Sequence, residues 1–136
     1  YGFFKEHALK KGDFKNSVGE QSGSATVVQK VAGDLGGIGY SGIGYLTAGV
    51  KALPLAEKDD GEVVAPTYEN CVSGTYPMWR FLYVYVNKKP GVPLEPLTGE
   101  FLKYVLSRGG QEVVVKDGYF PLPKAAIDEA LAELAK

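Results

Sequence analysis

The sequence predicts an α/β fold in which short strands alternate with helices. Apolar residues recur at helical spacing in several segments, and three short apolar runs bounded by glycine or proline have the length of strands. The chain has 136 residues, of which 45% are apolar and 23% are charged. A chain of this size and composition can bury a hydrophobic core.

Two helices are expected before residue 37. The first spans residues 2–11, carries Phe3, Phe4, His7 and Ala8 on one face, and ends at Gly12. The second begins at an N-cap on Ser24, has an apolar face of valines, and ends in the glycine-rich segment 33–37.

Residues 37–56 are expected to alternate between strand and helix. A short buried strand at 37–40 leads to a glycine-rich helix, which Ser41 caps and which reaches about Ala48. The next strand, 50–56, is assigned to a sheet edge because Pro54 has no N–H to donate to a ladder.

The second half contains the strand with the clearest pattern. Residues 81–86 are apolar on both faces, which is typical of a strand covered on both sides. A helical turn capped by Thr67 and ended by Gly74 precedes it. The predicted core consists of this strand together with apolar positions on other segments, namely Phe81, Tyr83, Val84, Val86, Ile38, Leu102, Leu106 and Leu131.

Two further helices are expected near the C-terminus. The first is capped by Thr98, and Gly109 and Gly110 interrupt it before Val113. The last helix begins with Pro123 at its first helical position.

Composition excludes several classes of function. The net charge is −1 and the only arginines are Arg80 and Arg108, which argues against binding to nucleic acid. No run approaches the roughly 18 consecutive apolar residues that a membrane span needs. Cys71 is alone, so neither an internal disulfide nor a thiolate metal cage is expected. The chain opens at Tyr1 rather than at a Met, and we interpret it as a segment of a longer protein.

The residues that often carry catalysis are sparse. His7 is the only histidine, and its position on an apolar helix face favours a structural role. Cys71 is interpreted as a small buried hydrophobe. Asp59, Asp60 and Glu62 are typical of a solvated turn. We therefore expect no catalytic residues, no metal site and no cofactor.

Two alternatives come from the glycines and the aromatic residues. Residues 37–42 spell G-x-G-x-x-G, which in an enzyme domain marks a nucleotide site, but only in the turn after a strand. Here the glycines fall within the expected strand, which favours close backbone packing. The aromatic side chains leave a carbohydrate-stacking platform open, formed from Tyr40, Tyr45, Tyr76, Trp79, Tyr83 and Tyr85.

Five segments, in order, resemble the phosphate-binding proteins of phosphate ABC transporters. They cover nearly the whole chain and consist of Tyr1–Leu9, Gly36–Tyr40, Tyr76–Tyr83, the region around Phe101, Leu102 and Gln111, and Gly118–Pro123. The resemblance implies part of a type II periplasmic-binding-protein fold, which has two α/β lobes joined by hinge strands. Residues 1–78 would belong to the second lobe, and residues 79–136 would supply a hinge strand and the C-terminal part of the first.

The resemblance also implies where an anion would be held. The family's arginine and Ser-Gly-Thr ligands precede the residue that matches Tyr1, so most ligands lie upstream of this chain. The helix start at Tyr1 and Gly2 would sit just behind the anion. Gln21, Ser22 and Ser24, at a second loop–helix junction, are candidates for an outer layer of polar contacts, with helix capping as the alternative role.

The implied function is capture of inorganic phosphate for an ABC-type importer, without catalysis. The implied partners are the permease subunits, and the implied location is the periplasm or the cell surface. Elements encoded upstream would be missing from the isolated chain, so it would pair with the N-terminal half of the protein or with a swapped copy of itself. The alternative from another class is a structural or signalling relative of this fold that has no anion site.

Overall fold

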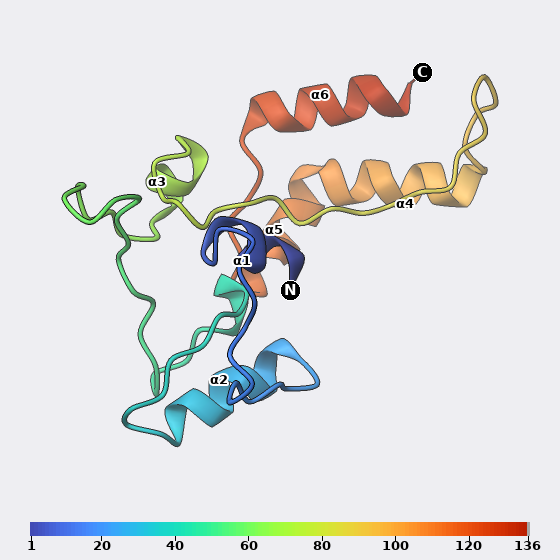
Figure 1. Ribbon diagram of the computed structural model, residues 1–136. Coiled ribbons are helices and arrows are strands. Elements are labelled where there is room, and N and C mark those ends of the chain that lie inside the picture. Colours follow the sequence, from blue (N-terminus) through green and yellow to red (C-terminus); the bar gives the residue numbers. More distant parts are fainter. Residues whose placement is uncertain (136) are drawn as a thin grey trace. The chain divides into compact units, whose positions relative to one another are not determined.

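The computed structural model describes residues 1–135 (Figure 1). Its helices are α1 (Gly2–His7), α2 (Ser24–Ala32), the 3₁₀ helix η1 (Ile43–Tyr45), α3 (Tyr68–Val72), α4 (Pro96–Leu106), α5 (Arg108–Lys116) and α6 (Lys124–Leu134). The chain divides into two compact units, Tyr1–Phe81 and a second unit that begins at Leu82. Among the described residues, no helix is long and apolar enough to cross a membrane.

Aromatic stacking and close backbone packing hold the first unit together. The ring of Phe4, on α1, stacks on Tyr40 with the ring centroids 4.1 Å apart, and Phe14 joins the same cluster. Gly39 lies against α2, where an added Cβ would come within 2.9 Å of Val27 and 3.0 Å of Val31. The segment around residue 40 therefore connects α1 to α2.

The second unit is a helical cluster in which α4 packs against both α5 and α6. Leu102 on α4 is buried, as predicted, and so is Gln111 on α5. The Gln111 side chain donates from Nε2 to the carbonyl of Val105 at 2.9 Å, and its Oε1 accepts from the N–H of Leu122 at 2.7 Å. One buried amide thus joins the end of α4 to the segment that leads into α6.

The predicted helices form, but several begin or end elsewhere than expected. Thr67 caps α3 as predicted, with its Oγ1 accepting from the N–H of Asn70. By contrast, α2 is capped by Gly23 rather than Ser24, and α4 by Glu95 rather than Thr98. The Glu95 carboxylate accepts from the N–H groups of Leu97 and Thr98 at 3.1 and 3.0 Å, so it satisfies two of the free N–H groups in the first turn.

The other boundaries also differ for local reasons. α1 ends at His7, because the chain reverses through Lys10 and Lys11 at positive φ. Helices α4 and α5 separate at Ser107, not at the two glycines, since Ser107 is extended and its Oγ accepts from Gly110 to start a new helix. Pro123 caps α6 instead of occupying its first turn, and the helix expected after Ser41 is reduced to η1.

The three predicted strands are not formed as ladders. Within residues 1–135 no strand is formed, and the only β-pairing is an isolated antiparallel bridge between Leu55 and Val64. Residues 37–40 and 81–86 have no helix or strand assignment. A strand is stabilised by hydrogen bonds to a neighbour, so an apolar run that finds no partner segment remains outside any sheet.

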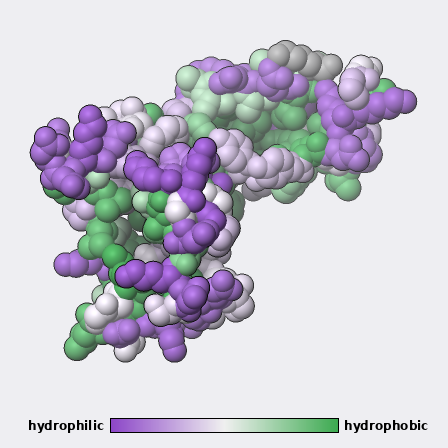
Figure 2. All heavy atoms as spheres, in the orientation of Figure 1, coloured by the Kyte–Doolittle hydropathy of each residue, from purple (hydrophilic) through white to green (hydrophobic). Residues whose placement is uncertain are grey.

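Much of the predicted core is therefore exposed. Tyr83 and Val84 are 62% and 60% exposed, and Ile38 is 81% exposed. Val86 and Leu131 also lie at the surface, whereas Phe81 and Leu106 are half-buried. These burial predictions were wrong because they assumed a covering layer that residues 1–135 do not provide. Apolar residues accordingly appear as green areas on the visible surface (Figure 2).

Candidate functional site

The residues expected near an anion all lie in the first unit, at the starts of α1 and α2. Tyr1 is the N-cap residue of α1, and Gly2 is its first helical residue. Gln21 and Ser22 are exposed in the loop before α2, and half-buried Ser24 is the first residue of that helix. Both helix starts therefore belong to one compact unit.

A short chain of contacts links the two helix starts. Phe4 in α1 stacks on Tyr40, and the adjacent Ser41 donates from its Oγ to the backbone carbonyl of Ser24 at 3.2 Å. Ser41 was expected to cap a helix of its own, yet its hydroxyl holds the first turn of α2. Because these contacts run from α1 to α2, they fix the first turn of α2 to the segment that packs on α1.

No side chain caps either helix. Neither Tyr1 nor Gly23 offers a side-chain acceptor to the first-turn N–H groups of its helix. Thr26 instead bonds the Gly23 backbone, with its Oγ1 accepting from the Gly23 N–H at 3.1 Å and donating to the Gly23 carbonyl at 2.6 Å. The first N–H groups of a helix need an acceptor, and an anion is a favourable one.

The predicted side chains differ in what they contact. Gln21 Nε2 makes a long bond of 3.5 Å to the carbonyl of Gly19. Tyr1 is 73% exposed, and its ring lies 5.1 Å from that of Phe14. Capping was the alternative role for Ser22 and Ser24, and Gly23 takes that position. The structure thus brings Gln21, Ser22 and Ser24 to one helix start without giving the two serine hydroxyls a capping role.

An ion pair joins α1 to the segment that follows it. Lys5 Nζ lies 2.6 Å from the Asp13 carboxylate. The hydrogen bond and the charge of Asp13 raise the pKa of Lys5, and Lys5 lowers the pKa of Asp13 in return. Sequence reasoning did not select this pair, because the two residues approach only after the chain reverses through Lys10 and Lys11.

The candidate catalytic residues have structural environments. The His7 ring stacks on Phe3 at 4.2 Å, and its Nδ1 donates to the Phe3 carbonyl at 3.0 Å. Cys71 is half-buried, and burial raises the pKa of its thiol, which disfavours the nucleophilic thiolate. Among the described residues, no cluster of His, Cys, Asp and Glu that could hold a metal is found.

The glycine motif at 37–42 does not have the architecture of a nucleotide site. It follows the turn after α2 and not a strand, and only the three-residue η1 comes after it. Gly39 has a packing role instead, since a side chain there would collide with Val27 and Val31. Close backbone packing is therefore the role that the structure supports for this motif.

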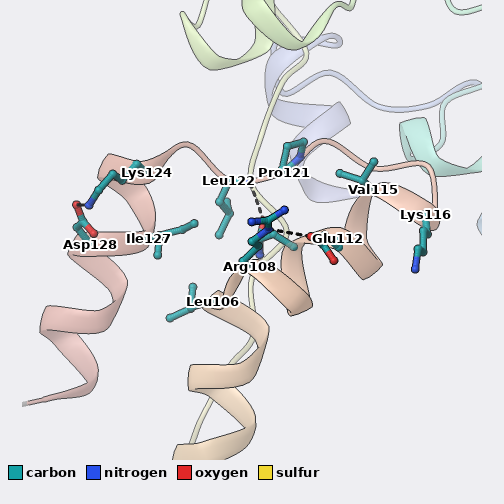
Figure 3. Close-up of a pocket in the computed structure, with 11 residues that line it drawn as sticks. Leu106, Arg108, Glu112, Val115, Lys116, Pro121, Leu122, Lys124, Ile127 and Asp128 are labelled. Carbon is teal, nitrogen blue, oxygen red and sulfur yellow. Dashed lines mark hydrogen bonds and ion pairs between the residues drawn. The ribbon is translucent and has the colours of Figure 1, made fainter.

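The second unit contains a separate hollow of about 760 Å³ between α5 and α6. Figure 3 shows Leu106, Leu122 and Ile127 lining it, with the Arg108–Glu112 ion pair on its rim. The floor is apolar and Lys124 is already paired with Asp128. A small inorganic oxyanion needs a dense set of polar donors, so this hollow does not suit one.

Comparison with known proteins assigns the class. The model of the PBP superfamily domain matches residues 3–108. The chain therefore belongs to the PBP superfamily, and the expected type II periplasmic-binding fold class is confirmed at the level of the family.

The curated relatives are more specific. The chain is 59% identical to "Phosphate-binding protein PstS" of Pseudomonas aeruginosa over 134 residues, which is 98% of this chain and 42% of that protein. It is 32% identical to a protein of the same name from Staphylococcus saprophyticus, over 98% of this chain and 41% of the relative. It is also 28% identical to "Protein SphX" of Synechococcus elongatus, over 96% of this chain and 39% of that protein. The chain thus spans about two fifths of the length of these relatives.

Proposed function

We propose that this chain is part of the phosphate-binding component of an ABC-type phosphate importer and that it performs no catalysis. The observation that carries the proposal is the 59% identity, over 98% of the chain, to a protein named for phosphate binding. The protein would work in the periplasm or at the cell surface and deliver phosphate to permease subunits.

Backbone chemistry at two helix starts supports an oxyanion as the ligand. The first turns of α1 and α2 lack side-chain caps, and contacts through Tyr40 and Ser41 link them within one unit. Helix N-termini offer N–H groups and a partial positive charge to anions. In the proposal, Tyr1 and Gly2 lie just behind the phosphate, and Gln21, Ser22 and Ser24 stabilise the surrounding loop through polar contacts.

The proposal assigns the chain to two lobes. Residues 1–78 belong to the second lobe, and residues 79–136 supply the hinge strand and the C-terminal part of the first. The extended apolar segment that contains Tyr83 and Val84 is exposed, as expected for a strand whose neighbours lie elsewhere. Its partner is the N-terminal half of the protein or a swapped copy.

Calorimetry on a polypeptide of the relatives' length that contains this chain tests the ligand class. Phosphate should release or absorb heat on binding, and it should raise the unfolding temperature, since a ligand bound only by the folded state stabilises it. Adding phosphate at 100 times its Kd should stabilise by about 2.7 kcal/mol. If phosphate produces neither a heat of binding nor a rise in unfolding temperature, the structural or signalling alternative is favoured and the proposal is refuted.

Serine variants in the same polypeptide test the site. Ser22→Ala and Ser24→Ala should each weaken phosphate binding by about tenfold or less, since an outer polar contact is worth no more than about 1.4 kcal/mol. Ser17→Ala is the control, because Ser17 is exposed, as Ser22 is, but lies outside the α2 junction. Equal affinity in all three variants would remove Ser22 and Ser24 from the site.

A further inference from the structure

The guanidinium of Arg80 lies over an aromatic ring of α1. Its carbon Cζ is 5.5 Å from the centroid of the Phe3 ring. A guanidinium within about 6 Å of a ring centroid is attracted by the negative face of the ring. The contact therefore joins α1 to the segment that ends the first unit.

The Phe3 ring is held in place from within α1. The His7 ring stacks on it with the centroids 4.2 Å apart, and His7 Nδ1 donates to the Phe3 carbonyl at 3.0 Å. Phe3 is also half-buried. A side chain that is already ordered loses little conformational entropy when a cation binds to it. The ring is thus a fixed partner for Arg80.

The turn directly before Arg80 is anchored as well. Tyr76 donates its hydroxyl to the carbonyl of Leu53 at 3.2 Å, and its own carbonyl accepts from the N–H of Trp79 at 3.3 Å. The Trp79 side chain lies close to Gly74, where an added Cβ would come within 3.4 Å of the indole nitrogen. Arg80 therefore extends from a segment that is fixed within the first unit.

Helix α1 depends on contacts of this kind because it is short. It has six residues, and isolated helices of fewer than about 12 residues are marginal in water. Phe3 and Phe4 are about 100° apart around the helix axis. Phe4 stacks on Tyr40, while Phe3 meets Arg80. One contact would leave the helix free to turn about it, whereas two contacts in different directions fix its orientation.

We propose that Arg80 is a positioning residue for phosphate binding, which acts by holding α1 through the Phe3 ring. The inference rests on the proposed function and deepens it. Helix α1 stacks on Tyr40, and the adjacent Ser41 donates to the Ser24 carbonyl at the start of α2. By fixing the orientation of α1, Arg80 also supports the contacts that reach the first turn of α2.

The phosphate affinity of variants tests the proposal in a polypeptide of the relatives' length that contains this chain. Calorimetric titration should show that Arg80→Ala raises the Kd about threefold, as expected for the loss of an exposed cation–π contact. Arg108→Ala is the matched control and should leave the Kd unchanged, because Arg108 is the other arginine of the chain and pairs with Glu112 on α5.

The Kd separates positioning from simple stabilisation of the fold. Circular dichroism at the titration temperature shows that each variant is folded. A residue that only stabilised the fold would lower the unfolding temperature without changing the affinity of the folded protein.

Three further variants identify the Phe3 ring as the partner. Arg80→Lys keeps the cation and should recover part of the lost affinity. Phe3→Leu keeps an apolar side chain without a π face, so it should weaken binding about as much as Arg80→Ala does. The double variant should bind no more weakly than either single variant, because both changes remove the same contact.

The outcomes distinguish this inference from the proposed function. If the wild-type polypeptide binds phosphate and Arg80→Ala binds it equally well, the inference alone is overturned. Additive losses in the double variant, or no recovery in Arg80→Lys, would also overturn it, since Arg80 would then not act through its cation on the Phe3 ring. A wild-type polypeptide that binds no phosphate would refute the proposed function and this inference together.

Discussion

Replacing the buried Gln111 by leucine should strongly destabilise the second unit. The two side chains have similar volume, but leucine cannot donate to the Val105 carbonyl at 2.9 Å or accept from the Leu122 N–H at 2.7 Å. Gln111 is only 8% exposed, so water cannot freely replace both bonds. Leaving a buried polar group unpaired costs about 1–3 kcal/mol. For two such groups that are partly rescued by relaxation, we expect a loss of about 2–4 kcal/mol in the free energy of unfolding.

Urea unfolding followed by far-ultraviolet circular dichroism measures this loss. The midpoint should fall while the dependence on urea stays the same, since the surface exposed on unfolding is unchanged. The matched control is Gln29→Leu, which makes the same substitution at an exposed position on α2 and should change stability by less than about 0.5 kcal/mol. If Gln111→Leu changes stability as little as Gln29→Leu does, the Gln111 bonds do not hold α4 to the segment before α6.

Three further predictions concern other contacts. Gly39→Ala should destabilise the first unit by about 1–3 kcal/mol, because its Cβ would lie 2.9 Å from Val27 and 3.0 Å from Val31; a thermal melt unchanged from wild type would contradict this packing. Hydrogen bonds to Thr98 and Leu97 lower the pKa of Glu95 from its ordinary value of 4.5, so the capped α4 contributes stability above that pH and loses it as the pH falls below 4.5. Glu95→Gln should flatten this part of the stability profile, and an unaltered acid profile would exclude Glu95 as its source. Burial raises the pKa of Cys71, so its alkylation at pH 8 should be slower in the folded chain than in urea, and equal rates would show an exposed thiol.

Local signals in the sequence predicted most helices but few of their boundaries. Thr67 and Gly74 correctly bound α3, because a capping hydroxyl and a glycine at positive φ act within a few residues. The caps at Gly23 and Glu95 were missed, because neighbouring serine and threonine side chains are equally plausible caps by sequence alone. The choice depends on which oxygen reaches the free N–H groups.

The strands could not be predicted in the same way. Residues 81–86 have the composition of a buried strand, yet strand pairing depends on segments that are distant along the chain. The same limit applies to the site. The candidate positions at α1 and α2 were found through resemblance, whereas the link from Tyr40 to Ser41 and Ser24 depends on tertiary contacts that no local pattern encodes.

Equilibrium dialysis with radiolabelled phosphate tests the central claim most directly. It compares the 136-residue chain with a polypeptide of the relatives' length that contains it. The longer polypeptide should bind one phosphate in a saturable manner, and the isolated chain should bind phosphate far more weakly, because the proposed arginine and hydroxyl ligands precede Tyr1. Tight binding by the isolated chain would refute the placement of the site, and a longer polypeptide that binds no phosphate would contradict the proposed function itself.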